Sequence, residues 1–290
     1  MIYETGLAWE EAKQKKVLLF AMSGLGKTHV SSMLRSGGDW FHYSVDYRIG
    51  TRYMDEYIVD NFKKAAMEVP FLANLLLSNS IYIASNITFE NLAPLSTYLG
   101  KPGDVSQGGI PFAEYCRRQR QHEAAEKSAL LDTPLFINRA LELYNYQNFV
   151  CDSGGSICEV VDPWNLADPV LKALSDNLMM VWIEGTDAHT QELVHRFDKS
   201  PKPMCYQPTF LLESWKEYQS ETGLNPDKVN PDDFIRWTYA RALAHRQPRY
   251  KQMAEWGITL HVDDVKAVSS PKSFENLVAS ALDLKTVKSA

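Results

Sequence analysis

The sequence predicts an α/β fold built on a five-stranded parallel sheet. Three observations predict it: five short apolar runs, unbroken apolarity within each run, and helical patterns between the runs. The runs are KVLLFA at 16–21, WFHYSV at 40–45, QNFVCD at 147–152, LMMVWIE at 178–184 and GITLHV at 257–262. Each has the length of a strand, and strands buried on both faces have this continuous apolar character. Strands that alternate with helices pack as a layered α/β core.

Composition narrows the class of protein. The chain has 290 residues, 45% of them hydrophobic, and a formal net charge of −6. This charge gives no general attraction for nucleic acid or an anionic membrane surface. We find neither a bilayer-length apolar run nor a secretory signal at the N-terminus, and we therefore expect a cytoplasmic protein. The four cysteines form no CxxC pair and the seven histidines show no metal-ligand spacing, so free thiols and ordinary histidines are expected.

The spacing of the runs indicates how the chain is organised. About 100 residues separate the second run from the third, and this stretch reads as mostly helical, ending in a helix from Pro134 to Tyr146 with Thr133 as its N-cap. A later segment, DKSPKPMCYQP, contains three prolines and predicts a loop before another helix. We therefore predict core segments at 1–50, 148–195 and 241–290, a helical insertion at 51–147 and a lid region at 196–240.

A phosphate-binding loop follows the first strand. The segment AMSGLGKT at 21–28 leads directly into HVSSMLRS, which reads as a helix, so strand, glycine loop and helix occur in the required order. Glycines in such a loop let backbone N–H groups converge on phosphate, the lysine reaches the β- and γ-phosphates, and the threonine hydroxyl binds Mg²⁺. Ala21 replaces the first glycine of the pattern, so this position needs a negative φ. We expect nucleotide contacts from Ser23, Gly24, Leu25, Gly26, Lys27, Thr28 and His29, with Thr28 as a Mg²⁺ ligand.

Later motifs occur in an order that resembles the shikimate kinase and gluconate kinase branch of the P-loop kinases. In that family the second strand ends in an aspartate, with arginines nearby, that hold the phosphate acceptor. The matching stretch here is YSVDYRIGTR, with Asp46, Arg48 and Arg52. The third strand of the family runs into a glycine cluster, matched here by FVCDSGGS with Gly154 and Gly155. The resemblance implies that these residues bind the acceptor.

The resemblance continues through the fourth strand to the last one. In VWIEGTDAHTQELVHRFDKSPKP, the family plan implies a cation near the adenine at Arg196 and one near the transferred phosphate at Lys202, and either residue fits the lid cation. The cluster HRQPRY before the last strand implies an acceptor contact from Arg246. The large insertion replaces a smaller acceptor-binding segment of the family, which predicts an acceptor other than shikimate.

Phosphoryl transfer requires charge neutralisation and alignment more than covalent help from the protein. Lys27 is therefore expected to carry much of the catalysis. Asp46 is the candidate base, since a carboxylate at the carboxyl end of a strand faces the ligand crevice. Asp152 also ends a strand and is expected to hold the Mg²⁺ shell, or to act as the base instead. A turn or cap role is the alternative for either aspartate.

Taken together, these motifs predict a P-loop NTPase-type three-layer sandwich with a helical insertion and a lid. The predicted activity is an ATP- and Mg²⁺-dependent kinase that phosphorylates a hydroxyl of a small anionic metabolite, since arginine forks suit carboxylate or phosphate. A nucleoside or nucleotide kinase and a nucleotide-binding regulatory NTPase are the alternatives. The charged run CRRQRQHE at 116–123 is read as a solvated helix face, with phosphate contacts as the alternative.

Overall fold

The computed structural model describes residues 1–289 and contains the five predicted strands, each within one residue of its predicted ends. They are β1 Lys16–Phe20, β2 Trp40–Ser44, β3 Asn148–Asp152, β4 Met179–Glu184 and β5 Ile258–His261. All neighbouring pairs are parallel, and the order across the sheet is β2-β3-β1-β4-β5. The predicted α/β class with a five-stranded parallel sheet is confirmed.

The strand order places a switch point beside β1. From β1 the chain crosses over β3 to reach β2 at one edge of the sheet. From β4 it continues in the opposite direction, to β5 at the other edge. In open α/β sheets, connections that diverge in this way leave a crevice outside the carboxyl ends of the strands, where ligands bind. The segment that follows β1 is therefore in the position that this fold offers to a ligand.

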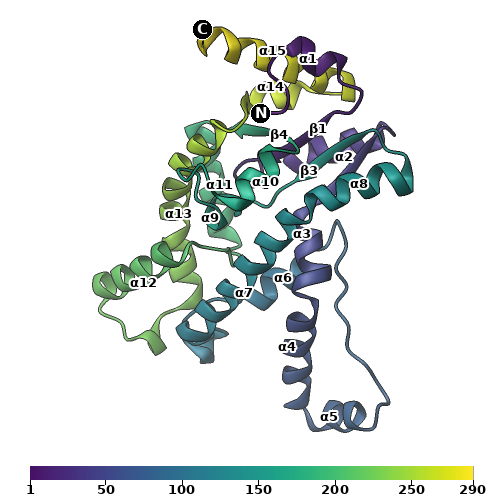
Figure 1. Ribbon diagram of the computed structural model, residues 1–290. Helices are drawn as coiled ribbons and strands as arrows, with labels where there is room; N and C mark the ends of the chain where they lie inside the picture. Colours follow the sequence, from purple (N-terminus) through teal and green to yellow (C-terminus); the bar gives the residue numbers. More distant parts are fainter. Residues whose placement is uncertain (290) are drawn as a thin grey trace. The chain divides into compact units, whose positions relative to one another are not determined.

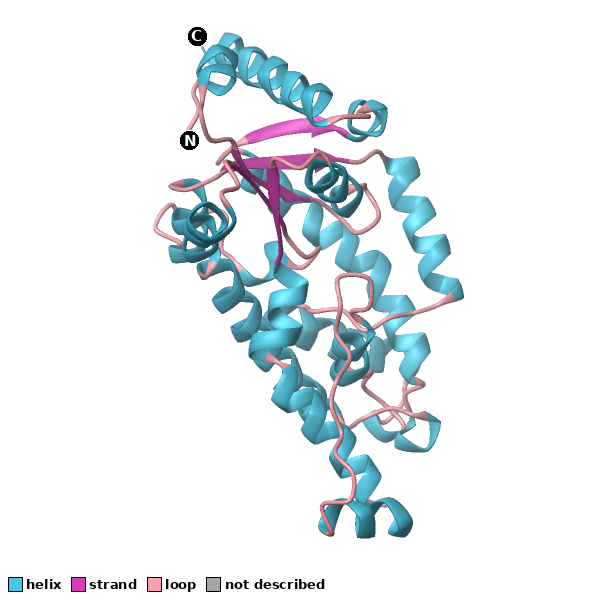
Figure 2. Cartoon of the chain, turned by 90° about the vertical axis from the view of Figure 1, so that its right-hand side faces the viewer, coloured by secondary structure: helices cyan, strands magenta, loops and turns pink. Residues whose placement is uncertain are grey.

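Helices cover both faces of the sheet (Figure 2). Tyr43 of β2 packs against Phe136 of α8 (Thr133–Tyr144), with ring centroids 4.8 Å apart. Trp40, three residues earlier, lies on the other face and meets Phe274 of α15 (Pro271–Ser289) edge-on at 6.4 Å. Because side chains alternate between faces along a strand, these two contacts define a layer of helix on each side. The result is a three-layer arrangement.

Helix α8 begins one residue earlier than predicted. Thr133 is its first helical residue and is fully buried, whereas Asp132 occupies the N-cap position. Asp132 has helical backbone angles, and its N–H bonds to the carbonyl of Ser128 in α7 (Phe112–Leu131). The two helices thus follow each other almost without a break, so no extended capping threonine is needed. The helix ends at Tyr144 rather than Tyr146, with Asn145 in the left-handed conformation.

The chain forms two compact units. The first consists of residues 1–45, 127–201 and 236–290 and contains the sheet. It also contains several shorter helices: α1 Gly6–Glu11, α2 Lys27–Ser36, α9 Ile157–Val160, α10 Pro169–Ser175, α11 Asp187–Lys199 and α14 Val262–Ala267. Helix α8 contacts β2 and β3 and so belongs to this unit, although the sequence placed its residues in the insertion. Helices α7 and α13 (Pro231–Ala254) contribute residues to both units.

The second unit consists of residues 46–126 and 202–235 and is built from helices joined by irregular segments. After α3 (Val45–Arg48) and a π-helical turn at Ile49–Tyr53, it contains α4 Asp55–Met67, α5 Pro70–Leu77, α6 Ala93–Leu99 and α12 Pro208–Thr222. An irregular segment returns from α5 alongside α4 (Figure 1), where Phe89 stacks on Tyr47 at 4.6 Å. Across residues 1–289, no helix combines the length and the apolarity needed to cross a bilayer.

Candidate phosphate-binding site

The loop between β1 and α2 has the backbone that an anion site needs. Gly24 has φ 82°, and Gly26, which is the N-cap of α2, has φ 95°. Only glycine adopts this left-handed region without strain, and the first N–H groups of a helix have no partner within it. Within residues 1–289, the only non-glycine residues of positive φ are Asn79 and Asn145. Ala21 therefore has a negative φ, as expected. The loop therefore presents backbone N–H groups at the positive end of α2.

Lys27 lies inside this loop. Its side chain is buried, and Nζ donates hydrogen bonds to the carbonyls of Ala21 at 3.0 Å and Met22 at 3.2 Å. The neighbouring Thr28 and His29 are exposed, as are Ser23 and Gly24. A buried ammonium beside exposed amides and a hydroxyl is a suitable donor set for a phosphate group with its Mg²⁺. The residues present therefore fit a nucleotide phosphate.

The glycine turn after β3 lies against the loop. A Cβ on Gly155 would come within 2.9 Å of Ser23 Oγ, so the lack of a side chain here lets the two segments approach closely. Ser153 anchors the turn, because its Oγ donates to the carbonyl of Leu19 in β1 at 2.9 Å. Gly154 is buried beside it. Two segments that are more than 120 residues apart in sequence thus meet at the carboxyl ends of adjacent strands.

Asp152 ends β3 and is buried. Its Oδ2 lies 3.6 Å from Nε2 of His42, which is also buried, in the adjacent strand β2. The imidazole of His42 thus lies beside this carboxylate on the side away from β1. The predicted role of Asp152 in the hydration shell of Mg²⁺ stays a prediction.

Helix α13 fixes the glycine turn through two buried side chains. Tyr250 donates from its hydroxyl to the carbonyls of Gly155 at 2.5 Å and Ala21 at 3.3 Å, and burial raises its pKa well above the usual value, so it stays protonated. Arg246 donates from Nη1 to the same Gly155 carbonyl at 3.2 Å and from Nε to Glu159 at 2.6 Å. Burial lowers the pKa of Arg246, but the Glu159 carboxylate more than offsets this and holds it above the usual value.

Helix α11 lies over the other side of the loop. A Cβ on Gly24 would lie 3.1 Å from Leu193 and 3.9 Å from Nη2 of Arg196. Arg196 is exposed, and its Nε pairs with Glu192 at 3.2 Å. Leu25 of the loop is buried against the start of the α11 connection, where a Cβ on Gly185 would come within 2.9 Å of it. The structure thus brings Arg196 to the loop.

The remaining predicted residues belong to the second unit. Asp46 lies in the first turn of α3, and Arg48, in its last turn, stands 5.5 Å from the ring centre of Tyr53. Arg52 is exposed in the π-helical turn, and Lys202 is exposed in the segment before α12. Their predicted contacts with an acceptor or with ATP stay predictions.

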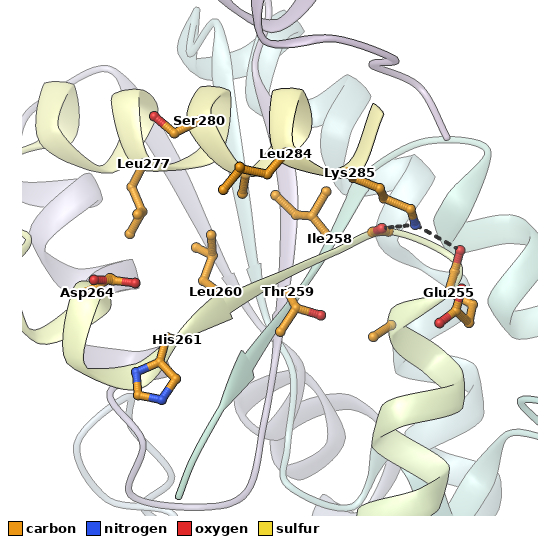
Figure 3. Close-up of a pocket in the computed structure, with 13 residues that line it drawn as sticks. Glu255, Ile258, Thr259, Leu260, His261, Asp264, Leu277, Ser280, Leu284 and Lys285 are labelled. Carbon is orange, nitrogen blue, oxygen red and sulfur yellow. Dashed lines mark hydrogen bonds between the residues drawn. The ribbon is translucent and has the colours of Figure 1, made fainter. Parts of the chain in front are cut away.

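A separate pocket of about 490 Å³ lies between β5 and α15 (Figure 3). Leucine and isoleucine side chains line its centre, and at one end Lys285 donates to the carbonyls of Gly257 and Glu255. The amine is thus used in joining α15 to the segment before β5. No residue of the 21–28 loop lines this pocket.

Sequence reasoning missed two buried partners of the predicted residues. Glu159 holds Arg246, and His42 faces Asp152. The burial of Glu159 could have been inferred from the sequence, because it is the single acidic residue in the apolar stretch ICEVV. An acid that is buried in such a stretch is nearly always paired with a cation, so a buried arginine or lysine partner would have been expected. Nothing in the sequence indicated the contact between His42 and Asp152, since the pattern of side chains along one strand does not show which strand lies next to it.

Comparison with solved structures gives a similarity of low degree. A shikimate kinase from Bacteroides thetaiotaomicron, solved by crystallography, aligns with a TM-score of 0.35 and 13% sequence identity, covering 93% of this chain and 98% of that chain. No family model and no curated protein sequence matches the chain. The α/β class itself follows from the five parallel strands and the helices on both faces of the sheet.

Proposed function

We propose that this chain is an ATP-dependent kinase that transfers the γ-phosphate of ATP to a hydroxyl of a small anionic metabolite. One observation carries the proposal: the loop between β1 and α2 combines two left-handed glycines, a buried lysine and a helix N-terminus at the switch point of the sheet. Each of these features favours a bound phosphate, and their combination is typical of nucleotide-binding loops.

On the donor side, Lys27 would exchange its bonds to the carbonyls of Ala21 and Met22 for bonds to phosphate oxygens. The exposed hydroxyl of Thr28 would hold Mg²⁺, with Asp152 contributing through its hydration shell. Mg²⁺, when bound, supplies charge neutralisation at the β- and γ-phosphates. Arg196, already next to Gly24, would provide a further cation, with Lys202 as the alternative.

On the acceptor side, Asp46 would take the proton of the acceptor hydroxyl as its oxygen bonds to the γ-phosphorus and the bond to ADP breaks. Arg48 and Arg52 would bind a carboxylate or phosphate of the acceptor. The glycine turn would support it from the core, with Gly154 and Gly155 leaving the backbone accessible. Arg246, held by Glu159, would position this turn through its bond to Gly155.

A nucleoside or nucleotide kinase is less well supported. Tyr47 and Tyr53, next to the predicted acceptor residues Arg48 and Arg52, are the rings that could stack a base, but Phe89 stacks on Tyr47 and Arg48 lies near the ring of Tyr53. The anionic metabolite therefore remains the primary proposal. A regulatory NTPase differs from both kinases in a measurable way, because its ADP release would not depend on an acceptor.

The first test is thermal unfolding with and without Mg-ATP. At a ligand concentration of about 100 times Kd, binding to the native state adds about 2.7 kcal/mol, which raises Tm by several degrees in a chain of this size. We expect this shift in the wild type and its loss in Lys27→Met, which keeps the buried alkyl chain but removes the amine. Lys172→Ala, at an exposed lysine of α10, is the control and should keep the shift. A wild type without a shift contradicts the proposal.

The second test measures ADP release with panels of sugar acids, hydroxy acids and sugar phosphates. A kinase of this class requires stimulation by at least one anionic acceptor, together with formation of a phosphorylated product. Steady ADP release that no acceptor changes would instead identify the regulatory NTPase.

A further inference from the structure

Two potential metal ligands share one face of α7. His122 and Glu126 are four residues apart, which places their side chains next to each other on a helix. Both are buried, and Nδ1 of His122 lies 3.7 Å from Oε2 of Glu126. Nδ1 of His122 has no hydrogen-bond partner in the described residues. This face of α7 was predicted to be solvated, but it points into the second unit.

Cys205 completes a cluster with these two residues. It is a buried cysteine in the irregular segment that precedes α12. One ligand atom of each residue, a nitrogen, an oxygen and a sulfur, lies within 4.8 Å of the other two. In a tetrahedral zinc site with bonds of about 2.0 to 2.3 Å, neighbouring ligand atoms are about 3.3 to 3.6 Å apart. The distances between the three ligand atoms would therefore have to shorten by about 1 Å for Zn²⁺ to be bound.

The segment that carries Cys205 is firmly held against α7. Gln119, fully buried on the same face of the helix, donates from Nε2 to the carbonyl of Met204 at 2.9 Å and accepts from the N–H of Tyr206 at 2.9 Å. Arg120 donates to the carbonyl of Tyr206 at 3.0 Å. The residues on both sides of Cys205 are thus fixed, so its sulfur is oriented before any ion arrives. Such supporting bonds are typical of metal sites.

We propose that His122, Glu126 and Cys205 form a zinc-binding site within the second unit. A nitrogen, a thiolate and a carboxylate are the ligand types that Zn²⁺ takes, and three protein ligands leave a fourth position for water or another group. One carboxylate, one thiolate and Zn²⁺ together form a neutral group, which suits a buried position.

This site differs in chemistry from the Mg²⁺ site of the proposed kinase. Mg²⁺ prefers oxygen ligands and retains several waters, whereas thiolate and imidazole favour Zn²⁺. All three residues belong to the second unit, whereas the 21–28 loop belongs to the first. A bound ion would join the segment before α12 to α7, two parts of the unit that are separated by about 80 residues of chain. The site therefore does not depend on whether the chain is a kinase.

The test is titration of the metal-free full-length chain with Co²⁺, whose absorption reports both thiolate ligation and tetrahedral geometry. We expect one equivalent of Co²⁺ to give a thiolate-to-cobalt charge-transfer band, and Zn²⁺ to displace it. Cys205→Ser should abolish the band, and His122→Asn should weaken Co²⁺ binding at least tenfold. Cys116→Ser is the matched control, because Cys116 is a free cysteine on the same helix outside the cluster, and this variant should behave as the wild type.

Two results would overturn the proposal. One is a wild type that shows no charge-transfer band and no rise in Tm with Zn²⁺. The other is a band that survives in Cys205→Ser or disappears in Cys116→Ser. Glu126→Gln keeps the shape of its side chain and, with circular dichroism as a folding check, should also weaken Co²⁺ binding at least tenfold. Unchanged affinity in this variant would remove the carboxylate from the ligand set.

Discussion

Glu159 and Arg246 form an ion pair that is almost completely shielded from water. Their side chains are 0% and 2% exposed, and they come from positions 87 residues apart in the sequence. Both charges lose their hydration on folding, and their mutual attraction offsets a large part of that loss. Because Arg246 also bonds to the carbonyl of Gly155, this pair connects the stability of the first unit to the shape of the proposed site.

We expect Glu159→Gln to destabilise the protein by about 3 to 5 kcal/mol, since it leaves the buried guanidinium without a counter-charge. Urea unfolding measures the change. The control is Asp176→Asn, which breaks an exposed pair with Lys172 and should cost less than about 1 kcal/mol. Equal losses of stability in the two variants would contradict the conclusion that burial makes the Glu159–Arg246 pair more important for stability than an exposed pair.

At the scale of residues, the sequence predicted the loop between β1 and α2 better than it predicted long-range contacts. Lys27 and the loop glycines were identified because their spacing along the chain is itself the signal. Glu159 and Cys205 were not, because each acts through a residue about 80 or more positions away. The burial of His122 was also missed: on a helix with several charged neighbours, the sequence does not show which side faces inward.

Among the elements, helix α2 has a glycine of positive φ at each end, and only one of the two lies in the loop between β1 and α2. Gly26 and Gly38 have φ values of 95° and 91°, and no atom lies within 4 Å of a Cβ built on either. Alanine at either position therefore meets backbone strain without a clash. The two residues lie at opposite ends of α2, and Gly26 alone belongs to the proposed nucleotide site.

We expect Gly26→Ala and Gly38→Ala each to lower stability by about 1 kcal/mol, because alanine resists the left-handed conformation. Only Gly26→Ala should also weaken the Tm shift caused by Mg-ATP. Differential scanning fluorimetry with and without ligand measures both effects. A similar loss of the shift in Gly38→Ala would mean that general destabilisation, rather than loop geometry, controls binding.

The strands were predicted almost to the residue because burial on both faces leaves an unbroken apolar run. The boundary between α7 and α8 was predicted less well. A threonine followed by proline is a common start for a helix, but here Asp132 keeps helical angles and the chain passes nearly directly from one helix to the next. Local capping signals lose their value where tertiary packing sets the boundary.

For the whole molecule, the two proposed ligands are expected to act on different units. Hydrogen exchange measures this directly. Zn²⁺ alone should protect residues 119–126 and 203–207, and Mg-ATP should protect residues 21–30 and 153–157. Protection of 21–30 by Zn²⁺ in the absence of nucleotide would contradict the assignment of the ion to the second unit.

The sequence predicted the class of the molecule but not its assembly. Five buried runs imply a parallel sheet, yet nothing in them states that β1 lies between β3 and β4. Nor did the sequence show that residues 46–126 and 202–235 form one compact unit. Both facts depend on contacts between distant segments, which a single sequence does not encode in any local pattern.

The edge of the sheet at β5 also bears on solubility. An edge strand exposes backbone groups that another chain can pair with, and proteins limit this risk with short edge strands and charged side chains. Strand β5 has only four residues, and Lys285 of α15 caps the carbonyl of Gly257 just before it (Figure 3). The C-terminal helix thus places a positive charge where an added strand would begin, which protects the molecule against edge-to-edge aggregation.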